Sequence, residues 1–305
     1  MKILLIGKNG QVGWELQRSL APLGEVIACD TDSAPPWRAD FTDRAGLAAL
    51  VRQSSPDLIV NAAAHTAVDK AEAEPNLAFA INAEAVGVLA DAAAAAGAWL
   101  VHYGTDYVFD GSGDTPRSED ASTRPLSVYG KSKLAGEELI RASGCRHLVL
   151  RTSWVYGARG DNFAKTMLKL ARSRDALSVI DDQIGAPTGA DLLADLTAHL
   201  VRMAVARPEL GGTYHAVASG ETSWYGYAKH VIEFARRAGD PIRVAPDAIR
   251  PIPSSAYPQA APRPRNSRLD TTRLRETFGM SLPPWQAGVE RMLREILPVA
   301  GAAGA

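Results

Sequence analysis

Short apolar runs alternate with longer amphipathic segments through the first half of the chain. The runs, which are rich in Ile, Leu and Val and do not strictly alternate with polar residues, are 3–6, 26–29, 58–60, 99–103 and 148–150. Such runs are typical of strands that are buried on both faces of a sheet. The segments between them predict helices over residues 11–20, 44–53, 75–96 and 128–142. This order predicts βαβ units and therefore an α/β fold with a mostly parallel sheet.

The pattern changes after about residue 150, where Gly and Pro cluster more tightly. Helices are still predicted over residues 163–174, 190–206, 223–238, 271–278 and 285–297. Residues 251–264 are rich in proline, which predicts an extended loop. We therefore expect one domain over residues 1–150, which a later segment rejoins, a smaller domain mainly from 151–298, and a frayed tail over 299–305.

Composition and charge narrow the class of protein. A chain of 305 residues is long enough to bury a large core. Its formal net charge of −1 gives no support to a nucleic-acid or membrane-surface partner. No run of apolar residues is long enough to predict a membrane-spanning helix. The only cysteines, Cys29 and Cys145, are interpreted as reduced, packed thiols of a cytoplasmic protein.

A glycine-rich turn follows the first predicted strand and opens the first predicted helix. The turn reads Gly7-Lys8-Asn9-Gly10-Gln11-Val12-Gly13. Glycines at this spacing allow a tight turn, close approach of the backbone to a pyrophosphate, and close packing of helix on strand. The context predicts a dinucleotide-binding site and hence a Rossmann-like doubly wound parallel sheet.

Acidic and small residues at the ends of the next strands extend this prediction. Asp30, at the end of the second strand, is placed to accept hydrogen bonds from the adenosine ribose, which favours NADH. Lys8 could offset part of its charge, so the use of both NADH and NADPH stays open. Asp40 and Phe41 are candidates for the adenine site, and the small residues that follow Asn61 are candidates to lie against the cofactor.

Tyr129 and Lys133 form a Tyr-x-x-x-Lys motif on a predicted helix. Residues at this spacing share one helix face, so we expect the Lys133 charge to lower the pKa of the Tyr129 hydroxyl. A phenol tuned in this way can exchange a proton with a carbonyl or an alcohol. Thr105, at the end of the fourth strand, could bind the same oxygen. His102, within that strand, is interpreted as a core residue.

Together, the glycine turn, Thr105, Tyr129 and Lys133 resemble the extended short-chain dehydrogenases/reductases. Further segments make the sequence similar to one family among them, the dTDP-4-dehydrorhamnose reductases, and these segments are residues 61–72, 105–111, 151–156, 182–188 and 263–270. The resemblance implies reduction of the C4 keto group of dTDP-4-dehydro-L-rhamnose by NADPH or NADH, the last step of dTDP-rhamnose biosynthesis, which supplies bacterial surface polysaccharide. It implies that Tyr129 protonates the C4 oxygen, that Lys133 holds the nicotinamide ribose, and that Thr105 polarises the carbonyl.

The resemblance also implies two sets of binding residues. The cofactor set comprises Gly7, Gly10, Gln11, Val12, Gly13, Asp30, Asp40, Phe41, Ala62, Ala63, Ala64, Thr66, Tyr129 and Lys133. The substrate set comprises Val68, Thr105, Asp106, Tyr107, Trp154 and Arg265. Arg263 and Arg268 are further candidates to contact the substrate pyrophosphate. Related dehydratases carry Asp-Glu after the threonine, so Tyr107 indicates simple ketone reduction.

Some members of the family form homodimers that hold Mg²⁺ through acidic residues at the interface. The matching positions are Glu15, Asp191 and Glu295, so a homodimer with a metal site of structural kind is implied. Other functions stay open: another nucleotide-sugar reductase or an epimerase on the same scaffold, or a non-catalytic regulatory subunit. The joint presence of Tyr129, Lys133 and Thr105 favours catalysis.

Overall fold

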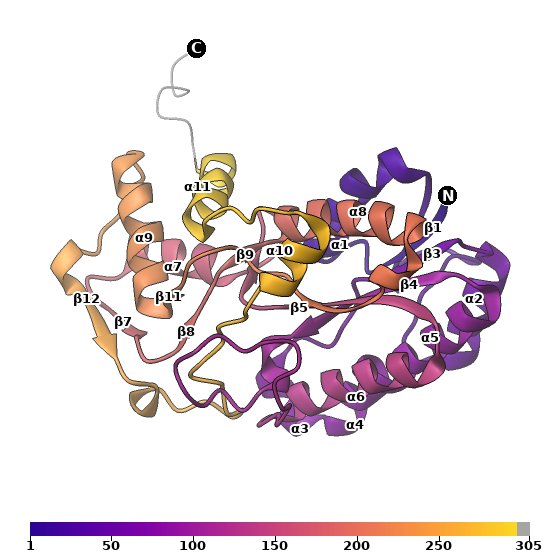
Figure 1. The fold of residues 1–305 in the computed structure, drawn as a ribbon. Coiled ribbons are helices and arrows are strands. Elements are labelled where there is room, and N and C mark those ends of the chain that lie inside the picture. Colours follow the sequence, from indigo (N-terminus) through magenta and orange to yellow (C-terminus); the bar gives the residue numbers. More distant parts are fainter. Residues whose placement is uncertain (298–305) are drawn as a thin grey trace, which may run out of the picture.

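A six-stranded sheet forms the centre of the protein, whose computed structural model describes residues 1–297 (Figure 1). The strand order is β10-β5-β4-β3-β1-β2, and every neighbouring pair is parallel. The strands are β1 (Lys2–Ile6), β2 (Glu25–Cys29), β3 (Leu58–Asn61), β4 (Trp99–Thr105), β5 (Arg146–Thr152) and β10 (Gly212–His215). The predicted α/β class, its parallel sheet and the first five strands are confirmed.

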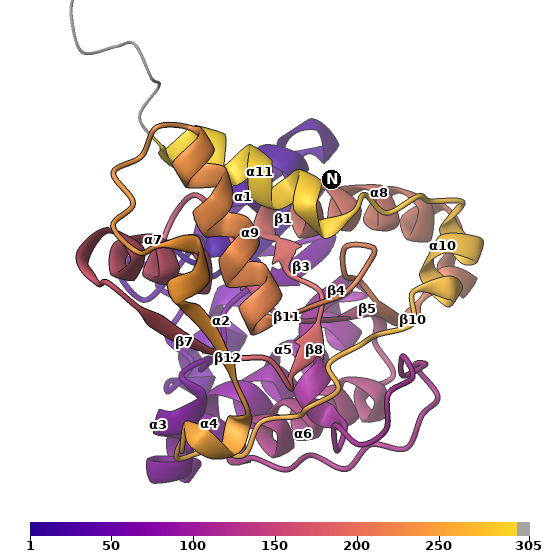
Figure 2. The same cartoon turned by 90° about the vertical axis from the view of Figure 1, so that its left-hand side faces the viewer.

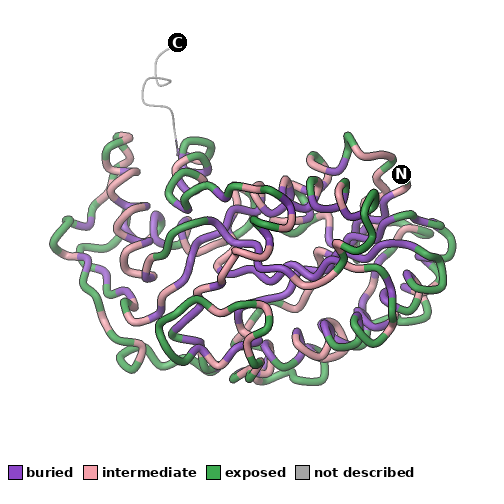
Figure 3. Tube along the Cα trace, viewed as in Figure 1, coloured by how far each residue is buried: buried purple, intermediate pink, exposed green. Residues whose placement is uncertain are grey.

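Helices cover both faces of the sheet, which explains why its strands read as continuous apolar runs. Ile3 and Leu5 of β1 point to one face, where α1 (Gln11–Leu20) and α8 (Ala190–Ala206) pack. Leu4 and Ile6 point to the other, where α2 (Arg44–Ser54), α5 (Ala85–Ala96) and α6 (Val128–Ser143) contribute to the core. Buried backbone accordingly runs through the middle of the molecule and exposed backbone through its rim (Figure 3).

The predicted helix over residues 75–96 is interrupted. It consists of α4 (Pro75–Phe79), a π-helical turn at Ala80–Glu84, and α5. By length and composition alone, Pro75–Ala96 could cross a membrane. In this fold, however, α5 packs between α2 and α6, and this burial accounts for its apolar composition. A short helix, α3 (Val68–Ala73), precedes it.

The second half builds a smaller group of elements beside the sheet (Figure 2). Its helices are α7 (Phe163–Ser173), α9 (Trp224–Arg237) and α11 (Trp285–Ile296), whereas α10 (Thr272–Phe278) packs on β10 of the central sheet. Its short strands pair as β6 (Val155–Tyr156) with β9 (Thr188–Gly189), β7 (Leu177–Ile180) with β12 (Ile249–Ile252), and β8 (Ile184–Gly185) with β11 (Thr222–Ser223). Single 3₁₀ turns lie at Ala21–Leu23, Asp106–Val108, Pro208–Leu210, Pro246–Ala248 and Ser254–Ala256.

The prediction of an extended proline-rich loop over residues 251–264 is wrong at the start of this segment. Pro251 and Ile252 belong to β12, which pairs in parallel with β7. A proline is tolerated there because a two-stranded sheet has only edge strands. Further on, Ser254–Ala256 forms a 3₁₀ turn.

Elements of the second half also complete the first-half sheet. Strand β10 pairs with β5, and α8 packs closely on α1. The boundaries 1–150 and 151–298 themselves stay a prediction. The tail predicted over residues 299–305 lies outside the described residues.

Candidate active site

A cavity of about 740 Å³ lies at the carboxyl ends of β1, β3 and β4. It brings together nearly all the residues that the sequence singled out, although they come from many separate segments. Those present are Gly7, Gly10, Gln11, Val12, Asp30, Asp40, Phe41, Ala62, Ala63, Ala64, Thr66, Val68, Thr105, Asp106, Tyr107, Tyr129, Lys133 and Trp154. Of the predicted binding residues, Gly13 and Arg265 do not line it.

At Gly7 and Gly13 the glycine turn is packed too closely for a side chain. Gly7 has a φ of 91°, and a Cβ placed there would lie 2.7 Å from the Ala63 nitrogen. A Cβ on Gly13 would lie 1.9 Å from the Gly7 oxygen, so Gly13 acts by letting α1 pack on the turn. Gly10 is the N-cap residue of α1 and has no side chain to cap the helix. The first N–H groups of α1 are therefore left free for phosphate oxygens. This cradle fits a dinucleotide.

Asp30 lines the cavity, and no basic side chain among residues 1–297 forms an ion pair with it. Its carboxylate accepts from the Asn9 backbone N–H at 3.1 Å. The Lys8 ammonium instead donates to the Ser33 hydroxyl at 3.0 Å and lies 3.7 Å from Asp32. The predicted offset of the Asp30 charge by Lys8 is therefore indirect.

Cofactor preference is expected to follow the charge of Asp30. We predict that Asp30→Ser raises the ratio of kcat/KM for NADPH over that for NADH by about tenfold, because it removes repulsion of a 2′-phosphate worth roughly 1–2 kcal/mol near a protein surface. Steady-state kinetics with each cofactor measure the ratio. Asp32→Ser is the matched control, since Asp32 lies on the same turn but does not line the cavity. An equal shift in both variants would contradict a specific role for Asp30.

The candidate catalytic side chains are held by the start of α6 and the end of β4. The Ser127 hydroxyl caps α6 by accepting from the Gly130 N–H, which fixes the first turn and with it Tyr129. Thr105 lines the same cavity as Tyr129, and its hydroxyl donates to Oδ1 of Asp106 at 3.2 Å. The Tyr107 ring packs edge-on against that of Tyr129, with centroids 5.4 Å apart.

The expected effect of Lys133 on Tyr129 is not found in this structure. The pKa of Tyr129 is raised to about 12: burial is the largest cause, the interaction with the Thr105 hydroxyl opposes it, and the charge of Asp106 adds to it. The Lys133 amine lies instead 3.1 Å from Nε2 of His102. Burial lowers the pKa of Lys133 itself to about 8. His102 is a buried core residue, as predicted, but it also contacts Lys133.

Asp106 carries an unsatisfied polar atom in this cavity. It is buried, and its Oδ2 has no hydrogen-bond partner within the described residues. Burial raises the pKa of its carboxyl to about 7, although hydrogen bonds with Ser267 and Thr105 oppose the shift. An acceptor held in this way fits a hydroxyl donor on a bound sugar.

Asp106 should make the cofactor-free protein less stable as the pH rises. Between its ordinary pKa and about 7 the folded state binds more protons than the unfolded state, so the free energy of unfolding falls with rising pH in this window and the penalty is complete above it. We expect Asp106→Asn to be more stable than wild type by a few kcal/mol at pH 8, with the difference fading toward pH 4, in urea unfolding. Asp110→Asn, which removes a half-buried carboxylate that is paired with Arg117, should show no such gain. A difference that does not change with pH would contradict the prediction.

An aromatic wall closes the far side of the cavity. Trp154 stacks on Trp224 with ring centroids 3.7 Å apart, and Phe163 packs against Trp224. Trp224 also lines an adjoining cavity of about 750 Å³, together with Tyr257 and Arg263. Sequence reasoning missed Trp224 because it sits on the first turn of an ordinary amphipathic helix, α9. It also missed Thr152, the last residue of β5, and Ser153 and Val155, which follow that strand.

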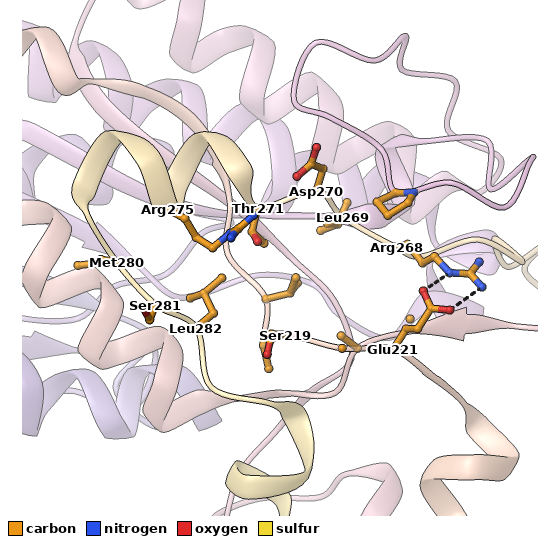
Figure 4. Close-up of a pocket in the computed structure, with 16 residues that line it drawn as sticks. Ser219, Glu221, Arg268, Leu269, Asp270, Thr271, Arg275, Met280, Ser281 and Leu282 are labelled. Atoms are coloured by element: carbon orange, nitrogen blue, oxygen red, sulfur yellow. Dashed lines mark hydrogen bonds and ion pairs between the residues drawn. The ribbon is translucent and has the colours of Figure 1, made fainter.

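The three candidate arginines have different surroundings. Arg263 lines the adjoining cavity and pairs with Asp69 at 2.7 Å. The Arg265 side chain is 70% exposed and lies 3.6 Å from Asp182, so its contact with substrate stays a prediction. Arg268 faces a third cavity of about 530 Å³, where Glu221 pairs with it (Figure 4). This cavity shares no lining residue with the one that holds Tyr129.

The sequence is similar to a known protein family over almost its full length. The family described as RmlD substrate binding domain matches residues 1–297. The dTDP-4-dehydrorhamnose reductase of Escherichia coli K12 is 56% identical over 296 residues, which cover 97% of this chain and 98% of that protein. The chain belongs to the dTDP-4-dehydrorhamnose reductase family.

Solved structures of dTDP-4-dehydrorhamnose reductases have the same fold. The protein from Clostridium acetobutylicum superposes with a TM-score of 0.86 at 35% identity, covering 97% of this chain and 99% of that one. The protein from Bacillus anthracis, solved in complex with NADP, gives a TM-score of 0.85 at 33% identity, covering 97% and 100%. The Rossmann-like fold, the family and the enzyme class, an NAD(P)-dependent oxidoreductase, are thus confirmed.

The three acidic residues that the resemblance implied for magnesium do not lie together within one chain of this protein. Asp191 and Glu295 both face Arg291, at 2.9 and 3.5 Å, while Glu15 pairs with Arg18 at 3.4 Å. Among residues 1–297 no group of three His, Cys, Asp or Glu side chains is arranged to hold a metal ion. Within one chain Arg291 thus supplies the counter-charge of Asp191 and Glu295, and the magnesium site implied at a dimer interface stays a prediction.

Proposed function

We propose that this protein reduces the C4 keto group of dTDP-4-dehydro-L-rhamnose to the alcohol, giving dTDP-L-rhamnose, with NADPH or NADH as the reductant. The observation that carries the proposal is one cavity that joins a dinucleotide cradle to Tyr129, Thr105 and Lys133, in a chain of this family. When bound, the reduced nicotinamide supplies the hydride.

Tyr129 is suited to act as the acid of this reaction. Because its pKa is raised to about 12, its hydroxyl stays protonated near neutral pH and can donate to the C4 oxygen as negative charge develops there. Thr105 can add a second hydrogen bond once its hydroxyl turns away from Asp106, whose Oδ1 lies 3.2 Å away. Lys133 would hold the nicotinamide ribose.

The adjoining cavity suits the nucleotide part of the substrate. It opens beside Trp224, is lined by apolar side chains of α7 and β7, and carries the Arg263 guanidinium. A base can lie against such a surface, while the guanidinium offers paired donors to the pyrophosphate. The stacked Trp154 and Trp224 would then lie between the sugar and the nucleotide.

The direct test is oxidation of NADPH and of NADH, followed by absorbance, with enzymatically prepared dTDP-4-dehydro-L-rhamnose. Steady turnover with one dTDP-L-rhamnose formed per cofactor oxidised is the expected result. If the cofactor binds but is not oxidised, the proposal fails, and another nucleotide sugar or a regulatory role takes its place.

A homodimer and a cytoplasmic location belong to the proposal as well. No step of the reaction uses magnesium, in keeping with the pairing of Asp191 and Glu295 to Arg291. Light scattering in the presence and absence of EDTA tests the assembly. A dimer that persists in EDTA is the expected result, and a monomer under both conditions would contradict it.

A further inference from the structure

A buried chain of hydrogen bonds runs from the backbone of the cofactor cradle to the catalytic amine. The Ala63 N–H donates to Oδ1 of Asn61 at 3.0 Å, and Nδ2 of Asn61 lies 3.1 Å from Nδ1 of His102. Nε2 of His102 lies 3.1 Å from Nζ of Lys133. The three side chains are each at most 2% exposed, so water cannot substitute for these partners. The chain thus links the end of β3 to α6.

The direction of every bond in this chain is set at its first member. A backbone N–H can only donate, so the amide of Asn61 must turn its oxygen to Ala63 and its nitrogen to His102. The amide nitrogen can only donate in turn, so Nδ1 of His102 accepts. A neutral imidazole that accepts at Nδ1 carries its proton on Nε2, and this N–H points at Lys133. An ammonium has no lone pair to accept this N–H, so the hydrogen-bond pattern is satisfied only when Lys133 is a neutral amine.

The surroundings of Lys133 are compatible with loss of its proton. His102 faces it from β4, Tyr129 lies one turn earlier on α6, and Glu137 lies one turn later. The charge of Glu137 raises the pKa of Lys133, but burial outweighs it and brings the pKa to about 8. The carboxylate of Glu137 is itself neutralised by Arg151. Burial also holds the pKa of His102 well below its ordinary value, so the ring stays neutral, as the chain requires.

We propose that Asn61 and His102 are positioning residues that hold Lys133 as a neutral amine in the cofactor-free protein, and that cofactor binding draws Lys133 away from His102 with uptake of one proton from solvent. This inference rests on the proposed function, in which Lys133 serves as an ammonium at the nicotinamide ribose. An ammonium that stayed in place would face the Nε2–H of His102, donor against donor. Proton uptake and departure from His102 are therefore coupled.

Calorimetry of NADH binding counts this proton. Titrations at pH 8, near the pKa of Lys133, in two buffers with different ionisation enthalpies are expected to give uptake of about half a proton per site in wild type, because half of the amines already carry a proton at that pH. Asn61→Asp reverses the chain, because a carboxylate accepts from both Ala63 and Nδ1–H of His102 and leaves Nε2 to accept from an ammonium. Uptake in this variant should fall close to zero.

Ser132→Ala is the matched control for calorimetry. Ser132 is buried beside Lys133 and is hydrogen-bonded to Asn82, but it takes no part in the series of hydrogen bonds from Ala63 to Lys133. Proton uptake in this variant should therefore match wild type. Binding of NADH without proton uptake in wild type would overturn the inference, as would unchanged uptake in Asn61→Asp. Absence of NADH binding would instead contradict the proposed function.

A second measurement on the wild-type protein does not depend on the folding of Asn61→Asp. Nitrogen NMR shifts of the imidazole rings identify which ring nitrogen carries the proton, and the His102 signals are assigned by their loss in His102→Gln. We expect the proton on Nε2 in the cofactor-free protein and a changed Nε2 signal once NADH binds. A proton on Nδ1 in the cofactor-free protein would overturn the inference, whatever the reaction proves to be.

Discussion

Tyr129→Phe is expected to lower kcat by about 10²- to 10⁴-fold while leaving NADPH and NADH binding nearly unchanged. The substitution removes the hydroxyl that would protonate the C4 oxygen. It keeps the ring that packs edge-on against Tyr107, so the wall of the cavity is preserved. Stopped-flow absorbance of cofactor oxidation measures the loss, and fluorescence titration measures cofactor affinity.

Tyr227→Phe is the matched control for this experiment. Tyr227 is a buried tyrosine of the second half that does not line the active-site cavity, and loss of its hydroxyl should leave turnover unchanged. A Tyr129→Phe variant that retained a tenth or more of wild-type turnover would contradict the role of Tyr129 as the proton donor. Such a result would favour an acid elsewhere in the cavity.

Glu137→Gln is expected to lower the free energy of unfolding by about 3–5 kcal/mol, because it leaves the Arg151 guanidinium buried without a counter-charge. The Arg151 side chain is 4% exposed and that of Glu137 is fully buried. Nε of Arg151 lies 3.1 Å from both carboxylate oxygens, and its terminal nitrogen lies 2.7 Å from one of them. The pair ties α6, which carries Tyr129 and Lys133, to β5 of the sheet. Urea unfolding of the cofactor-free protein measures the change.

Two further variants separate the buried charge from a general effect on α6. Glu138→Gln changes an exposed neighbour on the same helix and should alter stability by less than about 0.5 kcal/mol. The double variant Glu137→Leu with Arg151→Met removes both charges and should recover much of the loss. A loss in Glu137→Gln no larger than that in Glu138→Gln would show that the pair does not anchor the helix.

For Tyr129 and Lys133, the local sequence pattern predicts their position but not their surroundings. Their spacing of four residues fixes a common helix face, so the sequence could place both at one cavity. It could not show that burial raises the pKa of Tyr129, nor that the Lys133 amine faces His102 in the cofactor-free protein. Those outcomes depend on what other segments pack around α6.

The sequence by itself determined the elements of the first half, the glycine turn and the helix face of the Tyr–Lys pair. These features depend on periodicity, caps and glycine geometry, which act within a few residues of the chain. Only the tertiary structure decided that β10 completes the sheet, that Trp224 stacks on Trp154, and that Arg263 rather than Arg265 lines a cavity. These pairings join residues that are far apart along the chain. Their partners are chosen by packing and by the satisfaction of buried polar groups, and no local pattern of residues encodes that choice.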